Sequence, residues 1–314
     1  MTASERLVAD IGGTHARFAL CAPDGDLQAE QWLQVADYPG VVEAARAYLA
    51  GRQVTHAVFA VATHVDSDWI HLTNAPWGFS VRATEEALGL QRLAVINDFA
   101  AQALAVPRLA PNERTHIGGG EPQAGAAIGV IGPGTGLGVA GLLPVHGTWY
   151  PIPSEGGHVS LAPHDQRDAA LLAYLRRRFG HVSNERVLSG PGLINLAAGL
   201  AAIDGETLDL DDPREVSKRA ESGECRFCQE ALVRFASFLG AAAGDLALTL
   251  CALGGVYISG GLCRNLGALF DLERFRASFV AKGRFVDYLT RTPTFLVLRR
   301  DPGLLGAAAY PMPA

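Results

Sequence analysis

The sequence has few cysteines and no framework in which they could pair. Its 314 residues contain five, at positions 21, 225, 228, 251 and 263. An odd number without regular spacing argues against a disulfide-built secreted domain and favours a reducing compartment. Cys225 and Cys228 form one CxxC pair, but no second pair stands at the spacing of a zinc site. The surrounding segment, ECRFCQEALVRF, has the pattern of an amphipathic helix.

Basic residues are also in short supply. The chain has 26 Lys and Arg against 32 Asp and Glu, so the formal net charge is -6. Its one basic cluster, at residues 176–178, follows the apolar run LLAYL and suits a helix C-terminus. Without a basic stripe or patch, we expect no nucleic-acid partner.

Apolar runs long enough to span a membrane are nearly absent. The N-terminal segment MTASERLVADIGG lacks the basic and apolar regions of a signal peptide. The most apolar stretch, residues 238–261, approaches the roughly 20 residues that span a bilayer. However, Asp245 interrupts it, and Gly254 and Gly255 divide it into a helix-like half and a strand-like half. We therefore expect a buried helix followed by a buried strand, no membrane partner and a cytoplasmic protein.

What the chain does contain is an alternation of strand-like and helix-like segments. With 49% hydrophobic residues it can bury a large core, and its length suggests two domains. The apolar runs RLVADIG, HAVFAVA, RLAVIND, AAIGVIG, GVYISGG and TFLVLRR alternate with segments such as GVVEAARAYLAG and TEEALGL. This pattern predicts an α/β fold with mainly buried sheets. The Gly- and Pro-rich stretch 107–125 is loop-like and predicts a boundary between domains.

The stretch DIGGTHARFAL, residues 10–20, ends a predicted strand with unusual residue types. A hairpin in which Gly12 and Gly13 take positive φ accounts for the glycines. It does not account for Asp10, a carboxylate where a buried strand would continue apolar. A phosphate site accounts for all of them, because glycines let backbone N–H groups approach an anion and Thr14 adds a hydroxyl. Asp10 could hold a hydrated cation beside it.

The same pattern recurs in AAIGVIGPGTGLGVAGLL, where Gly134, Thr135 and Gly136 again follow an apolar strand and precede another. Two such turns favour two domains of related topology that share a phosphate ligand. A third glycine cluster, Gly260 and Gly261 after GVYIS, lies where α/β folds often bind ligands. A plain strand-to-helix turn explains that third cluster equally well.

Polar residues that follow strands indicate what receives the phosphate. In AVINDFAAQALA, Asp98 could be the N-cap of a helix, or it could accept a proton from an attacking hydroxyl that Asn97 holds. Glu155 and His158 in PSEGGHVSLAP and Glu185 in NERVLSGPG complete a set able to bind a polyol. Taken singly, these three could instead be surface acids and a loop histidine.

These segments together resemble a known family. DIGGTHARFAL, INDFAAQALA, GPGTGLGVA, PSEGGHVSLAP, ERVLSGPGL, GGVYISGG, KGRF and DPGLLGAA are similar to motifs of the bacterial glucokinase family, within the sugar kinase, actin and heat-shock chaperone superfamily. The resemblance extends from residue 8 to 308. It implies a two-domain actin-like ATPase fold, ribonuclease H-like, with a ligand cleft between the domains. Residues 1–108 plus 301–314 would form a small α/β domain, with DPGLLGAA as its last helix, and 109–300 a larger α+β domain.

The resemblance also implies a reaction, ATP-dependent phosphorylation of D-glucose at its 6-hydroxyl in glycolysis, with Mg²⁺ and commonly in a homodimer. Asp98 matches the catalytic base, and Asp10 matches the acidic residue that meets the metal through water. The residues that match sugar contacts are Asn97, Asp98, Glu155, His158 and Glu185. Those that match nucleotide contacts are Gly12, Gly13, Thr14, Gly134, Thr135, Gly136, Gly260 and Gly261.

The chain departs from the family at VATHVDSD, where the family often has a Gly-Pro turn. It also lacks the cysteine-rich zinc motif of the related group that contains repressors, which argues against a regulator. Two alternatives stay open, a kinase for another hexose or an amino sugar and a non-catalytic sugar sensor. The donor also stays open, since ATP, ADP or polyphosphate could each bind Gly-Thr turns.

Overall fold

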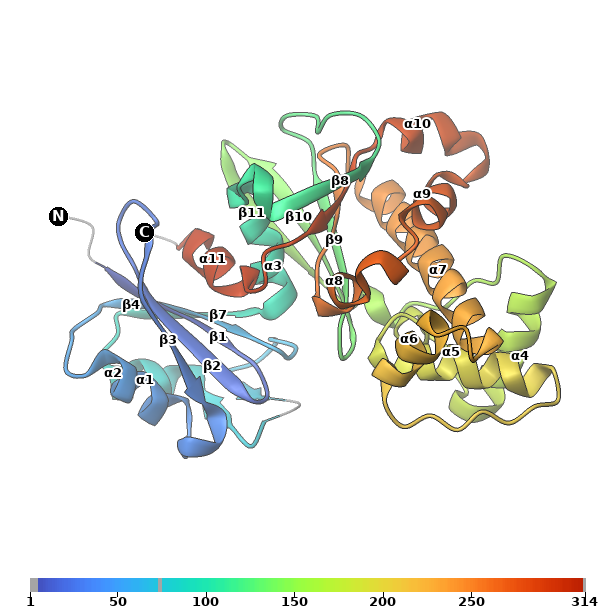
Figure 1. The fold of residues 1–314 in the computed structure, drawn as a ribbon. Helices are drawn as coiled ribbons and strands as arrows, with labels where there is room; N and C mark the ends of the chain where they lie inside the picture. The colour runs from blue at the N-terminus through green and yellow to red at the C-terminus, as the bar shows by residue number, and fades with distance from the viewer. Residues whose placement is uncertain (1–4, 73–74, 313–314) are drawn as a thin grey trace. The chain divides into compact units, whose positions relative to one another are not determined.

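The computed structural model describes residues 5–72 and 75–312. The predicted absence of a signal peptide concerns a segment whose first residues, 1–4, lie outside the described part. Contacts divide the chain into two units. Figure 1 shows the ribbon coloured by residue number. Unit 1 comprises Met1–Leu109, Leu142–Pro153 and Asp301–Ala314; unit 2 comprises Ala110–Gly141 and Ser154–Arg300. The predicted division differs, because it places residues 142–153 in the large domain together with the rest of 109–300. That division stays a prediction.

Unit 1 is built on a five-stranded sheet in the order β3-β2-β1-β4-β7. Strand β1 pairs with β2 antiparallel and with β4 parallel, and β4 pairs with β7 parallel. The central strands are nearly continuous apolar runs because both faces of the sheet are covered. The strands are β1 (Arg6–Ile11), β2 (His15–Cys21), β3 (Leu27–Gln34), β4 (His56–Val61) and β7 (Arg92–Asn97).

Helices cover both faces of this sheet. Figure 1 shows α1 (Val41–Leu49) and α2 (Val81–Leu88) on one side, with α3 (Asp98–Ala105) and α11 (Pro302–Ala309) on the other. The predicted C-terminal helix is therefore present as α11. It packs so closely on α3 that a Cβ on Gly306 would overlap the Ala101 carbonyl oxygen. A small hairpin, β5 (Trp69–His71) and β6 (Gly78–Ser80), and the 3₁₀ turns η1 (Val35–Asp37) and η2 (Val106–Arg108) complete the unit.

A second sheet has the order β11-β10-β9-β12-β13-β8. Strand β12 is parallel to both β9 and β13, and β8 is antiparallel to β13. Residues Leu142–Pro153, which form most of the β10–β11 hairpin, group with unit 1 by their contacts. The other strands belong to unit 2. The strands are β8 (Arg114–Gly118), β9 (Ile128–Pro133), β10 (Leu137–Val145), β11 (Thr148–Ser154), β12 (Val256–Ile258) and β13 (Thr294–Val297).

The loop predicted over residues 107–125 is partly wrong, since it contains β8 and the 3₁₀ turn η3 (Pro111–Glu113). The sequence of β8, RTHIG, shows no apolar alternation because β8 lies at the edge of its sheet. Its order comes from hydrogen bonds with β13, a strand that lies about 180 residues later in the chain. Nothing local in the sequence indicates that partner.

Helices α4 to α10 form the remainder of unit 2, with α7 at its core. The predicted passage from buried helix to buried strand is confirmed, since α7 ends at Leu250 and β12 begins at Val256. Helix α7 is long and apolar enough for a membrane span, yet 67% of its most apolar window is buried in the protein. The helices are α4 (Gln166–Phe179), α5 (Gly190–Ile203), α6 (Pro213–Glu221), α7 (Arg226–Leu250), α8 (Gly261–Leu266), α9 (Leu272–Val280) and α10 (Val286–Arg291).

The segment around the CxxC pair is helical, as the sequence predicts, and the pair stands at the start of α7. Cys225 is the N-cap, and its Sγ accepts a hydrogen bond from the Cys228 backbone N at 3.3 Å. Both side chains are buried, and burial raises the pKa of the Cys228 thiol to about 12. Across the described residues, no three side chains of His, Cys, Asp or Glu gather in a group that could hold a metal.

Candidate functional site

The first Gly-Thr turn connects β1 to β2. Gly12 N donates to the His15 carbonyl oxygen at 3.0 Å, and this bond closes the turn. The hairpin between β1 and β2 is present, but neither Gly12 nor Gly13 has positive φ, so the predicted conformation of the two glycines is wrong. A Cβ on Gly12 would meet its nearest atom, the His15 carbonyl oxygen, at 3.6 Å, which is ordinary contact. Neither conformation nor packing within the protein therefore requires glycine at position 12.

The charge of Asp10 is balanced by the guanidinium of Arg17, which is not among the predicted site residues. Asp10 lies directly opposite Arg17 in the β1–β2 register, and Arg17 Nη1 lies 3.0 Å from Asp10 Oδ2 and 2.7 Å from Asp301 Oδ1. Burial raises the pKa of Asp10, whereas Arg17 acts to lower it. A Cβ on Gly303 would lie 2.5 Å from Asp10 Oδ2, so α11 begins directly against this carboxylate. Arg17 could have been found from the sequence, because a hairpin that turns at residues 13 and 14 places residue 17 opposite Asp10.

The Asp10 and Asp301 carboxylates supply the hard oxygen atoms that Mg²⁺ accepts, commonly with several waters retained. Their side chains keep 17% and 31% of their surface exposed, which leaves room for contact through water. The residues therefore fit a hydrated cation beside them, although Arg17 already neutralises part of their charge. The role of Asp10 toward a metal stays a prediction.

The second Gly-Thr turn connects β9 to β10. Gly134 N donates to the Gly136 carbonyl oxygen at 2.8 Å, and Gly190 N donates to the Gly134 carbonyl oxygen at 2.8 Å. A Cβ on Gly134 would meet nothing within 4 Å, whereas one on Gly136 would lie 2.5 Å from Glu185 Oε2. Thr135 between them is exposed. The two glycines of this turn therefore serve different purposes.

The two glycines of the third cluster also differ in their surroundings. Gly260 has a φ of +86°, and a Cβ there would lie 2.6 Å from the Pro133 carbonyl oxygen. The fold alone thus requires glycine at 260, as the plain strand-to-helix interpretation expects. Gly261, the first residue of α8, has its nearest neighbours at 3.9 Å and 4.0 Å, so its surroundings are open.

Asn97 and Asp98 lie where β7 ends and α3 begins. Asn97 is the N-cap, because its Oδ1 accepts from Phe99 N at 2.9 Å and from Ala100 N at 3.3 Å. The alternative that Asp98 is the N-cap is therefore wrong. Asn97 Nδ2 also donates to the Thr63 carbonyl oxygen at 3.2 Å, so the divergent VATHVDSD segment fixes this amide. Asp98 is the first residue of α3, and its Oδ1 also accepts from Phe99 N at 2.9 Å, so its carboxylate is held at the start of the helix without being the N-cap.

Three predicted sugar contacts from two separate motifs gather around Leu137 within unit 2. Glu185, in the 3₁₀ turn η5 (Asn184–Arg186), accepts a hydrogen bond from Leu137 N through Oε2 at 2.9 Å. Glu155 precedes the turn η4 (Gly156–His158) and His158 ends it, and this turn contacts η5. A Cβ on Gly157 would overlap the Leu137 carbonyl oxygen, which explains the bare backbone between the two side chains.

Glu155 and His158 present their side chains to solvent. His158 Nε2 lies 3.9 Å from Glu155 Oε2, and the two side chains are 58% and 55% exposed respectively. The structure therefore brings Glu155, His158 and Glu185 together beside the second Gly-Thr turn. Asn97, Asp98 and the first Gly-Thr turn belong to unit 1.

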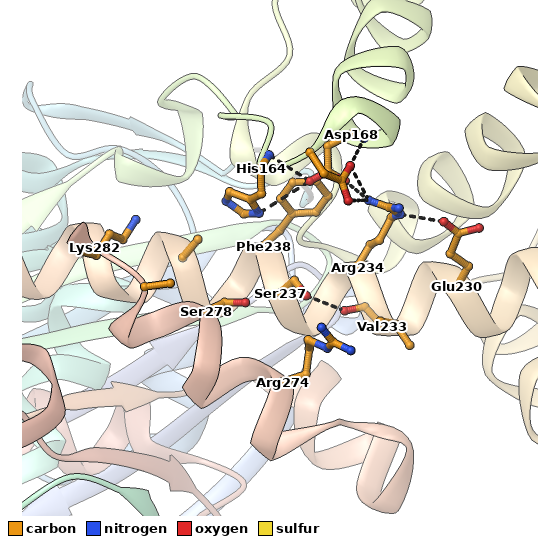
Figure 2. Close-up of a pocket in the computed structure, with 13 residues that line it drawn as sticks. His164, Asp168, Glu230, Val233, Arg234, Ser237, Phe238, Arg274, Ser278 and Lys282 are labelled. Carbon is orange, nitrogen blue, oxygen red and sulfur yellow. Dashed lines mark hydrogen bonds and ion pairs between the residues drawn. The ribbon is translucent and has the colours of Figure 1, made fainter. Parts of the chain in front are cut away.

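Two cavities lie in unit 2, and the predicted site residues line neither, although Gly156 and Asn184 beside them line the smaller one. Figure 2 shows one of about 660 Å³, where Asp168 and Arg234 point toward each other and Arg234 also meets Glu230. His164 lies beside Asp168 and lines this cavity too. The other, of about 230 Å³, lies between α7 and the segment 154–162.

Comparisons with known proteins agree with this arrangement. The family model described as Glucokinase matches residues 7–313. The chain is 48% identical to a glucokinase of Paramagnetospirillum magneticum, with 96% of each chain covered. It is 46% identical to a protein of Burkholderia lata named "Bifunctional protein glk", and it spans 48% of that longer protein.

Among solved structures, a glucokinase from an Antarctic psychrotroph has a TM-score of 0.89 and 40% identity, with 97% of this chain and 98% of that chain covered. This match confirms the predicted α/β actin-like ATPase fold. The family model covers nearly the whole chain, and relatives above 40% identity extend over the same length. The chain is therefore a member of the glucokinase family.

Proposed function

We propose that this protein phosphorylates D-glucose at its 6-hydroxyl with ATP and forms glucose 6-phosphate. Membership of the glucokinase family over residues 7–313 is the observation that carries the proposal. The local structure supports it, because Asp98 lies at a strand end and Asn97 performs the capping of the following helix. A carboxylate held at a helix N-terminus, where Phe99 N donates to its Oδ1, suits a general base.

In the proposed reaction, the glucose O6 atom attacks the γ-phosphorus of ATP in line with the departing oxygen of ADP. The O6–P bond forms as the bond to the leaving oxygen breaks, and Asp98 takes the hydroxyl proton. Asn97, Glu155, His158 and Glu185 hold the other hydroxyls of the sugar. Asn97 can contribute because its amide nitrogen carries a second hydrogen besides the one bonded to Thr63.

The nucleotide phosphates are assigned to backbone N–H groups of the two Gly-Thr turns. Gly12 and Gly134 support this assignment, because the protein requires glycine at neither, and their own N–H groups are bonded within the turns, which leaves the N–H groups of the following residues for the phosphates. Gly13, Thr14, Thr135 and Gly261 accompany them in the proposal, whereas Gly260 is explained by the fold. Mg²⁺ would neutralise phosphate charge, and Asp10 with Asp301 would hold its waters.

We also propose that the protein works in the cytoplasm, in glycolysis and as a homodimer. The cysteine content supports the compartment, because buried unpaired thiols suit reducing conditions. The dimer rests on the family resemblance, and sedimentation of the purified protein would test it. A single species of about the mass of one chain, 33.1 kDa, would contradict it.

A coupled assay over a panel of hexoses and donors tests the main proposal. Glucose with ATP should give the highest kcat/KM. Preference for another hexose or an amino sugar would favour the alternative kinase, and preference for ADP or polyphosphate would change the donor. Sugar binding without turnover under every condition would identify a sensor, which the presence of both turns and Asp98 argues against.

A further inference from the structure

We propose that Gly136 and the backbone N–H of Leu137 position the carboxylate of Glu185 for sugar binding. The second Gly-Thr turn would then serve the sugar as well as the phosphates. Gly136 and Leu137 are positioning residues in this scheme, since they act through Glu185. The proposal rests on the role of Glu185 as a sugar contact.

The carboxylate of Glu185 lies directly on the bare backbone of the turn. Its Oε2 accepts from Leu137 N at 2.9 Å and would lie 2.5 Å from a Cβ on Gly136. Gly136 does not have positive φ, so backbone conformation does not demand glycine there. Within 4 Å of that Cβ position, the recorded neighbours are both atoms of the Glu185 carboxylate group. The missing side chain at 136 is thus explained by the space that Glu185 occupies.

The chain that carries Glu185 is attached to the turn at a second point. Gly190 N donates to the Gly134 carbonyl oxygen at 2.8 Å, which holds the far end of the 185–190 segment on the first residue of the turn. Between the two points, Ser189 Oγ donates to the Glu185 carbonyl oxygen at 2.8 Å. The segment therefore spans the turn, with Glu185 bonded to one end and Gly190 to the other.

This anchoring suits a group that must meet a ligand in one orientation. A carboxylate can accept about four hydrogen bonds, so the bond to Leu137 N uses one position and leaves capacity for sugar hydroxyls. A charge-assisted bond of this kind fixes the side chain before the sugar arrives, which lowers the entropy lost on binding. Leu137 also packs through its carbonyl against Gly157, between the other two predicted sugar contacts of unit 2.

Two alanine substitutions in one turn separate this role from a general effect on the turn. Gly136→Ala places a methyl group on the Glu185 carboxylate, whereas Gly134→Ala places one where no atom lies within 4 Å. We would measure the glucose Kd by calorimetry without nucleotide. Gly136→Ala should raise the Kd at least about tenfold, the loss expected for one hydrogen bond to a charged group. Gly134→Ala should leave the Kd within about twofold of wild type.

A double-mutant cycle with Glu185→Ala tests whether the effect passes through Glu185. In that background Gly136→Ala should change neither the glucose Kd nor the Tm, because the group it displaces is gone. If Gly136→Ala lowers the Tm in the wild-type background, that loss should vanish in the double variant. Equal Kd values for Gly136→Ala and Gly134→Ala, or a loss that persists without Glu185, would overturn the proposal.

Two controls distinguish a failure of the positioning role from a failure of the proposed function. Wild-type protein that does not phosphorylate glucose would contradict the function itself. Glu185→Ala protein that binds glucose as tightly as wild type would remove Glu185 from the sugar site, and the positioning role with it. If wild-type turnover and the Glu185→Ala loss both appear, the comparison of the two glycine variants decides the positioning role alone.

Discussion

At the scale of single residues, Asp98 offers the sharpest test because its neighbour performs the structural task. Asp98→Asn keeps the shape of the side chain and removes the proton acceptor. We expect kcat to fall at least about 10²-fold, since a positioned general base contributes roughly 10²- to 10⁴-fold. The thermal midpoint should stay near that of wild type, because the Asn97 cap is untouched. Both quantities should be measured on one preparation.

Asn97→Ala is the matched control at the adjacent position. It removes the side chain that accepts from Phe99 N and Ala100 N, so it should lower the free energy of unfolding by about 1 kcal/mol. The two variants should therefore differ in kind, one losing turnover and the other also losing stability. A folded Asp98→Asn protein with near wild-type kcat would exclude Asp98 as the base.

At the scale of elements, an ion network joins α4 to α7. Arg167 Nε on α4 lies 2.6 Å from Glu230 Oε1 on α7, and Arg234 Nε, one turn further along α7, lies 2.9 Å from the same oxygen. Arg234 also pairs with Asp168 of α4, as Figure 2 shows. Burial acts to raise the pKa of Glu230, but hydrogen bonds from the two arginines outweigh it and the pKa is lowered.

This lowered pKa predicts a pH-dependent contribution of Glu230 to stability. A carboxyl group whose pKa is lower when folded stabilises the protein above its unfolded pKa, near 4.5, and loses that effect as the pH falls through the folded value. Glu230→Gln should therefore lower the free energy of unfolding at pH 7 by about 0.5–1 kcal/mol after allowance for solvent screening. Denaturant unfolding should show the difference from wild type shrinking as the pH falls below about 4.

An exposed pair provides the control for this measurement. Arg226 pairs with Glu206 at 2.7 Å, and their side chains are 66% and 56% exposed. Glu206→Gln should change the free energy of unfolding by no more than a few tenths of a kcal/mol, since exposed pairs contribute little. If the Glu230→Gln difference has the same size at pH 7 and at low pH, the charge of Glu230 is not its source.

At the scale of the whole molecule, the predicted sugar contacts belong to both units. Asn97 and Asp98 lie in unit 1, and Glu155, His158 and Glu185 lie in unit 2. A ligand that contacts both units favours the arrangement in which both reach it. Small-angle scattering should therefore show a smaller radius of gyration when glucose is added. A sugar that the hexose panel finds not to bind is the control, and identical profiles with and without glucose would contradict a shared sugar site.

Much of the architecture follows from local sequence. Strands β1, β4 and β9 could be predicted because burial on both faces produces nearly continuous apolar runs. The repeated Gly-Thr turns and the helix around the CxxC pair follow from patterns within a few residues. Strand β8 could not be predicted in this way, because an edge strand with polar residues depends on a partner far along the chain.

The amino-acid sequence by itself determined the buried strands, the alternation of strands with helices, where the glycine turns lie and which family the motifs resemble. Only the tertiary structure decided what each of those residues contacts. It placed Asp301 beside Arg17 and the Glu185 carboxylate on the backbone at Gly136, and it gave the cap of α3 to Asn97 rather than Asp98. The physical reason is range, since periodicity and turn chemistry act over a few residues, whereas ion pairs and close packing join positions that only the folded chain brings together.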